Sequence, residues 1–298
     1  MSLVPYDDRD GYIWFDGEML PWRDAKVHVL THGLHYASCV FEGERVYGGT
    51  VFKLTEHSQR LVDSAELMDM GMPYDTAAID QATRQVVAAN KIGDGYVRPV
   101  AWRGAEMMGV SAQQAKIHVA IAAWQWPSYF TPEARLRGIR MTRAPYDRPS
   151  PRTAPAKAKA AGLYMICTLS KHAAEAKGYD DALMLDYRGY LAEGTGANLF
   201  LVIDGALHTP TPDCFLDGIT RRTVIDLARA RGIEVIERHI RPEELATAQE
   251  VFLTGTAAEV TPVREIDEYN FQVGGLCRRL IADFEAVTRQ TAARSRAV

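Results

Sequence analysis

A lysine and a glutamate, each set among small residues, lie 34 positions apart near the middle of the chain. Lys159 stands in an alanine-rich stretch and is followed five positions later by Tyr164, while Glu193 opens the glycine-rich turn EGTGAN. A lysine amine that forms a Schiff base needs a snug site that lowers its pKa. The coenzyme pyridoxal 5'-phosphate (PLP) also needs an anion beside its ring nitrogen, so that the ring acts as an electron sink. This stretch could supply both groups.

The two motifs together match the pattern of a known family. The chain reads KAAGLY from Lys159 and EGTGANLF from Glu193. It resembles the branched-chain aminotransferases of PLP fold type IV, whose pattern is K-A-[AG]-G-x-Y followed by E-G-x-G-x-N-[LIV]-F. The resemblance implies an α/β fold of two domains, a smaller N-terminal α/β domain and a larger C-terminal domain with a barrel-like mixed sheet, with the active site between them. Lys157 falls where the family varies, so we expect Lys159 to form the Schiff base and Lys157 to be a solvated loop charge.

The resemblance also implies how the cofactor is held. Tyr164 would hydrogen-bond the phenolic oxygen of PLP, and Glu193 would pair with the ring nitrogen. Free N–H groups at a helix start favour anions, and LDGITRRT offers such a start for the phosphate, although taken alone it is an ordinary helix start. Arg60, which by itself reads as a helix-surface arginine, matches the family's phosphate arginine. With Lys159 as the catalytic residue, the cofactor set implied is Arg60, Tyr164, Glu193, Gly196, Asn198, Gly218, Ile219, Thr220 and Thr256.

The expected substrate site depends on the motif GYVRP, which contains Tyr96 and Arg98. In the resemblance, Tyr96 helps to bind the substrate α-carboxylate, and Arg98 receives the side-chain carboxylate of glutamate. One pocket must then hold both a leucine side chain and a carboxylate, which an apolar chamber with one arginine at its rim can do. Phe41 has an equally good alternative role in core packing. The substrate set implied is Tyr36, Phe41, Tyr96, Arg98, Val110, Tyr129, Ala257 and Ala258.

Three histidines form a competing pattern. His28, His32 and His35 have spacings that could suit zinc if the segment were helical, and a zinc hydrolase would be a different class of function. Gly33 and the β-branched residues argue against a helix, and HExxH with its glutamate is missing from the segment. The segment also coincides with a family block, H-x-[LIM]-[ST]-H-[AG]-L-H-Y. We therefore expect no metal, and histidines that satisfy hydrogen bonds beside the cofactor pocket.

Bulk properties narrow the class of protein. Hydrophobic residues make up 47% of the 298 residues and charged residues 24%, which is enough to build a core. A net charge of -4 without a basic stripe argues against a nucleic-acid partner. No apolar run reaches the ~18 residues of a membrane-spanning helix, and the acidic N-terminus lacks the apolar stretch of a secretory signal. The four cysteines make no CxxC pair, so we expect reduced thiols in a cytoplasmic protein.

Turn and cap signals predict the elements. Residues 12–22 predict a hairpin around Asp16-Gly17. Thr55 and Thr220 are expected to cap helices that reach about Met70 and Arg231. Further helices are predicted over 80–89, 163–177 and 277–288, and strands over 96–102, 117–124, 139–146, 182–186, 199–203, 207–209, 233–237 and 251–253. The expected domains are 1–124 and 139–298, joined by a linker over 125–138 that holds Pro127 and Pro132.

The expected function is transfer of the amino group of leucine, isoleucine or valine to 2-oxoglutarate. Residues 108–110 resemble a family segment that reaches the neighbouring subunit, which implies at least a homodimer. Same-fold alternatives are a D-amino acid or (R)-amine transaminase, and aminodeoxychorismate lyase, which eliminates pyruvate and needs no second amino acceptor. Tyr96 and Arg98 with Tyr36 favour the branched-chain version. A non-catalytic relative that keeps the cofactor for scaffolding is disfavoured by the intact lysine, glutamate and phosphate set.

Overall fold

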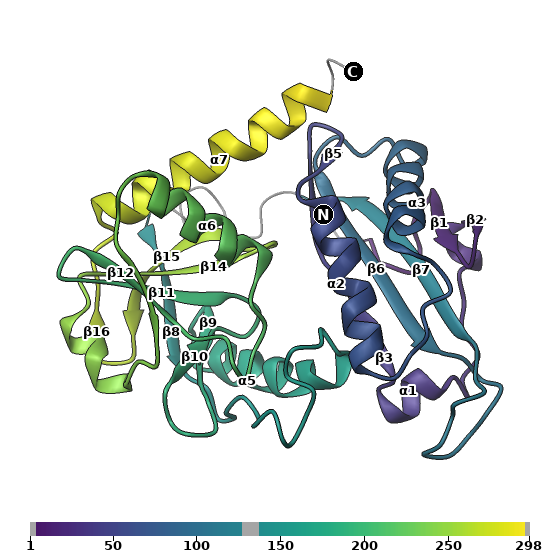
Figure 1. The fold of residues 1–298 in the computed structure, drawn as a ribbon, viewed down its shortest axis with the longest axis horizontal. Helices are drawn as coiled ribbons and strands as arrows, with labels where there is room; N and C mark the ends of the chain where they lie inside the picture. Colours follow the sequence, from purple (N-terminus) through teal and green to yellow (C-terminus); the bar gives the residue numbers. More distant parts are fainter. Residues whose placement is uncertain (1–3, 127–136, 296–298) are drawn as a thin grey trace. The chain divides into compact units, whose positions relative to one another are not determined.

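The computed structural model describes residues 4–126 and 137–295, and these residues form two compact units (Figure 1). The first unit contains residues 4–126, 158–162 and 289–295, and the second contains 137–157 and 163–288. Lys159 therefore lies in a five-residue segment that belongs to the first unit, although the chain on both sides of it belongs to the second. The domain ranges drawn from the sequence, with their linker, stay a prediction. No helix in the described part of the chain is long and apolar enough to cross a membrane.

The first unit is built on a seven-stranded antiparallel sheet in the order β2-β1-β7-β6-β4-β5, with β3 also paired to β6. Helices α2 and α3 pack against each other and against its strands. The strands are β1 (Tyr12–Phe15), β2 (Glu18–Pro21), β3 (Cys39–Phe41), β4 (Glu44–Tyr47), β5 (Thr50–Val51), β6 (Gly95–Arg103) and β7 (Ile117–Gln125). The helices are η1 (Trp22–Asp24), α1 (His32–Tyr36), α2 (Leu54–Leu67) and α3 (Thr76–Ala89).

Alternation along β6 decides which side chains reach each face of this sheet. Successive strand side chains point to opposite faces, so Val97 and Ala101 share one face and Tyr96, Arg98 and Val100 share the other. Val97 and Ala101 are fully buried, and the face that carries them is part of the core. The opposite face is thereby left to carry the tyrosine and arginine of the GYVRP motif.

The predicted hairpin is confirmed, because β1 pairs with β2 along its whole length. Its two turn residues, Asp16 and Gly17, have φ values of 50° and 102°. A two-residue hairpin turn that follows the twist of its strands requires such left-handed conformations, which aspartate tolerates and glycine adopts freely. The Asp-Gly signal in the sequence was therefore sufficient to place this turn.

Both predicted threonine caps are wrong. Helix α2 begins at Leu54, and its N-cap is Lys53. The Thr55 hydroxyl instead donates to Asp80 Oδ2 on α3 at 2.7 Å. Helix α6 begins after Gly218, so Thr220 lies within its first turn. A short hydroxyl side chain can bond either to the local backbone or to a tertiary partner, and for Thr55 the neighbouring helix supplies that partner.

The second unit is built on a barrel. Six strands follow one another as β10-β9-β8-β15-β14-β11, and β11 pairs back to β10, which closes the ring. The sheet is mixed, because β8 runs parallel to both β9 and β15 while the other ring pairs are antiparallel. The strands are β8 (Ile139–Arg143), β9 (Asp181–Leu185), β10 (Leu191–Glu193), β11 (Asn198–Ile203), β12 (Ala206–Pro210), β13 (Val235–Arg238), β14 (Glu250–Gly255), β15 (Glu259–Ile266) and β16 (Tyr269–Asn270). Its helices are α5 (Met165–Ala176), α6 (Ile219–Ala230) and η3 (Pro242–Thr247). The residues of η2 (Ala161–Tyr164) and α7 (Gly275–Ser295) are divided between the two units.

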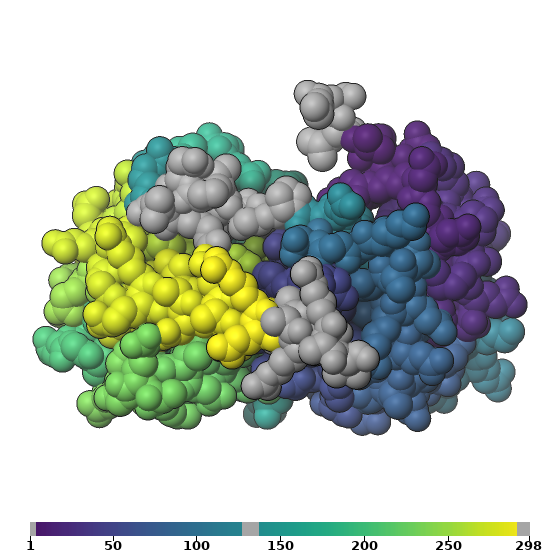
Figure 2. All heavy atoms as spheres, turned by 90° about the horizontal axis from the view of Figure 1, so that it is seen from above, coloured from purple at the N-terminus to yellow at the C-terminus, as the bar shows by residue number. Residues whose placement is uncertain are grey.

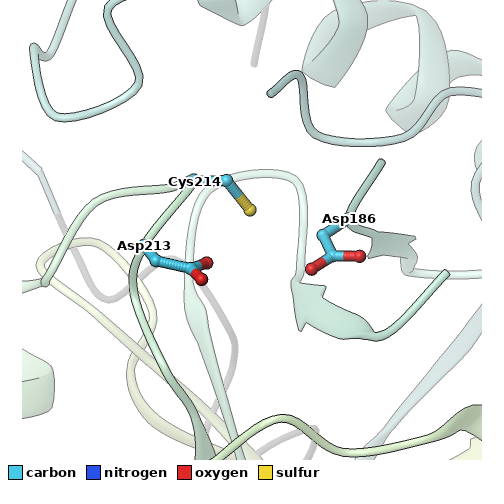
Figure 3. Close-up of side chains that lie close together, drawn as sticks. All are labelled: Asp186, Asp213 and Cys214. Atoms are coloured by element: carbon cyan, nitrogen blue, oxygen red, sulfur yellow. The ribbon is translucent and has the colours of Figure 1, made fainter. Parts of the chain in front are cut away.

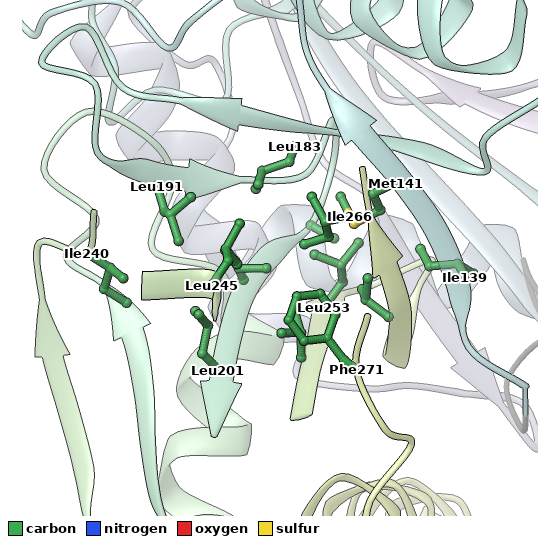
Figure 4. Packing of buried hydrophobic residues seen from close by; sticks show 14 of the residues in the cluster. Ile139, Met141, Leu183, Leu191, Leu201, Ile240, Leu245, Leu253, Ile266 and Phe271 are labelled. Atoms are coloured by element: carbon green, nitrogen blue, oxygen red, sulfur yellow. The ribbon is translucent and has the colours of Figure 1, made fainter. Parts of the chain in front are cut away.

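Aliphatic side chains from many strands fill this barrel. Met141, Leu183, Leu191, Leu201 and Leu253 are all buried and project into the same interior (Figure 4). Outside the barrel, α7 lies beside α6 (Figure 1 and Figure 2). Arg231, the C-cap of α6, pairs with Asp283 of α7 at 2.5 Å. The barrel is therefore a packed core, and its functional groups must lie at its rim.

Candidate active site

The backbone of Lys159 is anchored on both sides in the first unit. Its N–H donates to Ser64 Oγ on α2 at 3.0 Å, and its carbonyl accepts the N–H of Phe41 at 3.1 Å. Its Nζ lies 5.2 Å from the centre of the Phe41 ring. Lys159 is half-buried, whereas Lys157 is exposed, as the sequence had predicted for a loop charge. The two competing lysines therefore differ in environment, and Lys159 has the environment of a reactive amine.

The surroundings of Lys159 lower its pKa from 10.5 to about 8. Desolvation by the surrounding protein is the largest cause, and the guanidinium of Arg60 adds to it. The carboxylate of Glu42 acts in the opposite direction and offsets part of the shift. A pKa near 8 leaves a much larger fraction of neutral amine at neutral pH than an ordinary lysine has, and only the neutral amine is nucleophilic.

A fully buried carboxylate, Glu42, joins two side chains of α2. Arg60 donates from Nε to Oε1 at 2.6 Å and from Nη2 to Oε2 at 2.8 Å, and His57 Nδ1 lies 2.6 Å from Oε2. Burial alone would raise the pKa of the Glu42 carboxyl, but Arg60 and His57 together hold this pKa well below its ordinary value. Burial lowers the pKa of His57 more than Glu42 raises it, so the ring is neutral at pH 7 and donates its Nδ1–H.

Sequence reasoning identified Arg60 but missed Glu42 and His57. One signal was available, because His57 and Arg60 are three residues apart on a helix and such residues share a face. Glu42 gave no signal of its own, since a lone glutamate after a strand is usually solvated.

The predicted substrate residues of β6 lie beside Phe41. Arg98 Cζ lies 4.7 Å from the centre of the Phe41 ring and 5.4 Å from that of Tyr96. Gly43 lets the Tyr96 hydroxyl approach, because a Cβ at residue 43 would come within 1.9 Å of that oxygen. A cavity of about 460 Å³ opens on this face, and among the described residues that line it Arg98 alone is charged. Arg98 Nε has no hydrogen-bond partner within the described residues.

Four of the predicted substrate residues that the structure describes are not part of this cluster: Tyr36 and Val110 in the first unit, and Ala257 and Ala258 in the second. Tyr36 ends α1 and is 44% exposed, with its ring stacked on His32. Val110 is 88% exposed. Tyr129 lies outside the described residues. An 88% exposed valine on an ordered loop is available to a second polypeptide chain.

The three histidines do not converge on a common point. His28 Nδ1 accepts the N–H of Leu30, His32 Nε2–H donates to the carbonyl of Gly109, and His35 Nε2–H donates to the carbonyl of Val29. The expectation that Gly33 and its neighbours would prevent a helix is wrong, because residues 32–36 form α1. Each ring is nevertheless engaged with a different backbone group, so the zinc pattern in the sequence does not become a ligand set.

One group of three potential metal ligands does come together in the described residues. The ligand atoms of Asp186, Asp213 and Cys214 lie within 4.8 Å of one another (Figure 3). Arg188 Nη2 already pairs with Asp186 Oδ2 at 2.6 Å and with Asp213 Oδ1 at 2.9 Å. Burial raises the pKa of the Cys214 thiol to about 12. Two carboxylates that share one guanidinium, beside a protonated thiol, make an ion-pair cluster.

Glu193 stands at the rim of the barrel, at the end of β10. Its Oε1 lies 3.3 Å from Arg148 Nε, and its Oε2 accepts from Asn198 Nδ2 at 3.2 Å. Asn198 is paired directly with Glu193 across the two strands and also donates to the carbonyl of Leu216. Arg148 and Glu193 are both buried. The carboxylate is thus oriented from two sides, and Arg148 is a partner that the sequence did not reveal.

Three small-residue turns surround this rim. Gly218 is the N-cap of α6, and a Cβ there would come within 2.2 Å of Asn198 Oδ1. A Cβ on Gly255 would come within 3.2 Å of Ala197 Cβ. Ile219 and Thr220 form the buried start of α6, and Thr256, Ala257 and Ala258 form the turn between β14 and β15. A buried carboxylate can accept a hydrogen bond from a protonated ring nitrogen, and the N–H groups of a helix start can donate to a phosphate.

Tyr164 ends η2 and is partly buried against Cys167 and its neighbours. Gly196 lies in the turn between β10 and β11. Every described residue of the predicted cofactor set in the second unit, Tyr164 excepted, therefore lies at the barrel rim or at the start of α6. Arg60 alone of that set belongs to the first unit.

The fold, the residues around Lys159 in the first unit and the residues around Glu193 in the second define a known class of protein. Residues 39–266 match the family model described as amino-transferase class IV. The chain therefore belongs to the class IV aminotransferases, a family of PLP-dependent transferases, and the predicted family and fold class are confirmed.

Individual relatives narrow this class. The chain is 45% identical over 264 residues to the branched-chain-amino-acid aminotransferase of Pseudomonas aeruginosa, covering 87% of this chain and 86% of that protein. The crystal structure of the Escherichia coli branched-chain amino acid aminotransferase matches with a TM-score of 0.91 and 40% identity, covering 94% and 95% of the two chains. A T.th. branched-chain amino acid aminotransferase complexed with N-(5'-phosphopyridoxyl)-L-glutamate matches with a TM-score of 0.90 and 37% identity, covering 95% of each chain.

Proposed function

We propose that this enzyme is a branched-chain L-amino acid aminotransferase that moves the amino group of leucine, isoleucine or valine to 2-oxoglutarate, using PLP bound as a Schiff base to Lys159. The observation that carries the proposal is the environment of Lys159. Its pKa of about 8 suits both nucleophilic attack and proton transfer near neutral pH. The 45% identity to a protein of that name supports the substrate class.

The residues of the two units would divide the work on the cofactor. Glu193, oriented by Arg148 and Asn198, would face the ring nitrogen, and Tyr164 would hydrogen-bond the phenolic oxygen. The phosphate would take the N–H groups of Ile219 and Thr220, together with Thr256 and Arg60, while Gly196 and Gly218 leave room for the group. Bound PLP supplies an electron sink for the charge left when the substrate Cα loses its proton. Lys159 Nζ would take that proton from Cα and return it in the reverse direction.

The substrate would lie against β6. Tyr96 and the N–H groups of Ala257 and Ala258 would hold its α-carboxylate, and Phe41 would contact its aliphatic side chain. Tyr36, Val110 and Tyr129 would complete the wall in the proposed assembly. Arg98 would hold the second carboxylate of 2-oxoglutarate or glutamate, as an arginine with an unpartnered Nε beside an apolar cavity is suited to do. The glutamate adduct carried by the T.th. relative is consistent with this second role.

Arg98→Met is expected to separate the two substrates. Removal of the guanidinium leaves the second carboxylate of 2-oxoglutarate without its partner, at a cost of about 2–4 kcal/mol, or roughly 30- to 1000-fold in kcat/KM. The reaction with leucine in the absence of 2-oxoglutarate should change less than about fivefold, because an apolar side chain loses no charged partner. Stopped-flow kinetics of each half-reaction measure this split, and an equal loss in both would contradict the role of Arg98.

Gly218→Ala is expected to weaken PLP binding by about tenfold or more, equivalent to ~1.4 kcal/mol. The new Cβ would meet Asn198 Oδ1 at 2.2 Å, so Asn198 must shift and release Glu193. Fluorescence titration of the cofactor-free protein with PLP measures the Kd. Gly71→Ala is the matched control, because nothing lies within 4 Å of its added Cβ.

We further infer a homodimer or higher homo-oligomer in the cytoplasm. The 88% exposure of Val110 and the 44% exposure of Tyr36 support an interface with a second copy of this chain. All four cysteine thiols are unpaired, which is the state that a reducing compartment maintains. Analytical ultracentrifugation measures the assembly.

An assay of glutamate formation tests the proposed function. The purified enzyme with PLP and 2-oxoglutarate is offered L-leucine, L-isoleucine and L-valine, and in parallel D-alanine and a primary (R)-amine. Glutamate formed from the L-amino acids alone is the expected result. Glutamate or amino-acceptor product from D-alanine or the amine would replace the proposal by one of its same-fold alternatives, and pyruvate released from aminodeoxychorismate would assign the lyase.

A further inference from the structure

Glu42, whose carboxylate is fully buried, belongs to neither the substrate set nor the cofactor set of the proposed function, but it bonds one member of the cofactor set, Arg60. Its hydrogen bonds within the described residues go to the two α2 side chains and to the adjacent backbone N–H of Gly43, at 3.3 Å. It therefore joins the proposed phosphate arginine to a neutral histidine, in the unit that also holds Lys159. Burying a carboxylate costs folding free energy unless the charge is paired. The charge of Glu42 therefore acts through the side chains that pair with it.

We propose that Glu42 is a positioning residue which fixes the orientation of Arg60 and, by its charge, keeps Lys159 sufficiently basic to accept the substrate proton. The inference rests on the proposed function. It adds a residue that neither contacts the substrate nor belongs to the cofactor set derived from the sequence.

Geometry supports the orienting role. Two parallel N–H···O bonds from one guanidinium, at 2.6 and 2.8 Å, fix both the position and the plane of the Arg60 head group. His57 supplies a third short bond, at 2.6 Å, and prevents the carboxylate from turning away. A guanidinium held in this way is pre-organised, so it loses little conformational entropy when it binds a phosphate.

The charges of Arg60 and Glu42 have opposite effects on the pKa of Lys159, which supports the role of Glu42 in proton transfer. Arg60 destabilises the protonated form of Lys159, and Glu42 stabilises it. Removing the negative charge of Glu42 also leaves the positive charge of Arg60 uncompensated, so both changes lower the pKa of Lys159. Removing Arg60 instead leaves Glu42 unopposed and raises that pKa. A nearby opposite charge shifts a pKa by about one unit or more.

Other described groups also face this network. Arg98 lowers the pKa of Lys159, Tyr96 raises it, and His57 is neutral. Glu44 is also fully buried, and neither of its carboxyl oxygens has a hydrogen-bond partner within the described residues. Burial, together with the charges of Glu42 and Asp80, raises the pKa of Glu44 well above its ordinary value, which favours the neutral carboxyl.

Glu44 therefore provides a matched control for Glu42. The two glutamates are two residues apart and equally buried, but the pKa of the Glu42 carboxyl is lowered, whereas that of Glu44 is raised. Glu42→Gln removes a carboxylate that pairs with Arg60 and His57, whereas Glu44→Gln replaces a carboxyl without a hydrogen-bond partner in the described residues by an amide of the same shape. A purely structural effect of placing glutamine in this strand region would appear in both variants.

The test measures the protonation of Lys159 directly. Competitive acetylation of the cofactor-free full-length chain across pH 6 to 11, read at the Lys159 peptide by mass spectrometry, gives the titration midpoint of its amine. The expected midpoint is about 8 for the unaltered chain. It should be about one unit lower in Glu42→Gln, about one unit higher in Arg60→Gln and unchanged within about 0.3 unit in Glu44→Gln.

Two results would overturn the inference: a Glu42→Gln midpoint within about 0.3 unit of the unaltered chain, or shifts of the same sign in Glu42→Gln and Arg60→Gln. If Glu42→Gln does not fold, as judged by circular dichroism, Arg60→Gln becomes the test. A lowered Lys159 midpoint in Arg60→Gln is then sufficient to overturn the inference. The visible absorbance of the holoenzyme is recorded in parallel. A chain that shows no PLP band but keeps the expected order of midpoints would contradict the proposed function and leave the electrostatic role of Glu42 standing.

Discussion

Lys159→Ala is expected to lower the turnover number by at least about 10⁴-fold and to remove the visible absorbance of lysine-bound PLP. The substitution removes both the amine that binds the cofactor and the base that moves the Cα proton, and general acid–base catalysis alone contributes roughly 10²–10⁴-fold. The side chain is half-buried and lies beside Phe41, so no solvent group of similar basicity is held in its place. Steady-state assays with L-leucine and 2-oxoglutarate, with a spectrum of each preparation, measure both effects.

Lys157→Ala is the matched control for this prediction. Lys157 has the same chemistry two positions earlier, but its side chain is exposed. We expect turnover within about twofold of the unaltered enzyme and a normal absorbance band, because surface substitutions change little. Loss of the band in Lys157→Ala with retention in Lys159→Ala would reverse the assignment of the two lysines.

Glu193→Gln is expected to lower the turnover number by about 10²–10³-fold, the loss typical of a pre-organised electrostatic partner. Glutamine keeps the shape and the contact with Asn198, but it carries no negative charge to hold a proton on the ring nitrogen. It also leaves the buried guanidinium of Arg148 without its carboxylate at 3.3 Å, so some loss of stability should accompany the loss of rate. Turnover is measured at saturating PLP, and thermal unfolding gives the change in Tm.

Glu265→Gln distinguishes the chemical effect from the structural one. Glu265 also forms a two-bond pair with an arginine of the barrel, Arg140, at 2.7 and 2.8 Å. Its loss should shift Tm by a few degrees at most and leave turnover within about twofold, because an ion pair that is still partly open to solvent contributes about 0–1 kcal/mol. If Glu193→Gln affects turnover no more than Glu265→Gln does, Glu193 is not the partner of the ring nitrogen.

Local patterns in the sequence predicted the local structure well. The Asp16-Gly17 turn, the long strands β6 and β7 and the helix after Tyr164 follow from turn chemistry and from runs of apolar residues. The predicted cap at Thr55 failed because its hydroxyl bonds a neighbouring helix, which is not visible in a local window. The predicted cap at Thr220 failed because α6 begins after Gly218, before Thr220 is reached.

Long-range partnerships account for what the sequence could not reveal. Arg148 meets Glu193 across 45 residues of chain, and Glu42 meets Arg60 across 18. The return of residues 158–162 to the first unit has no periodicity or composition that would mark it. Lys159, by contrast, was identified because its motif is continuous in the chain. The parts of the candidate site that are contiguous in the chain were therefore predictable from the sequence. The residues that orient the predicted side chains or shift their pKa values, Arg148 and Glu42, were not predictable.

The visible spectrum of the purified protein with PLP, recorded before and after addition of L-leucine, tests the central claim most directly. The account predicts a band near ~410–430 nm that L-leucine converts to one near ~330 nm, as expected when a lysine-bound PLP accepts an amino group. A band that ignores L-leucine but responds to D-alanine or an amine would keep the cofactor and contradict the substrate. The absence of any band, even with PLP in excess, would contradict the assignment of Lys159.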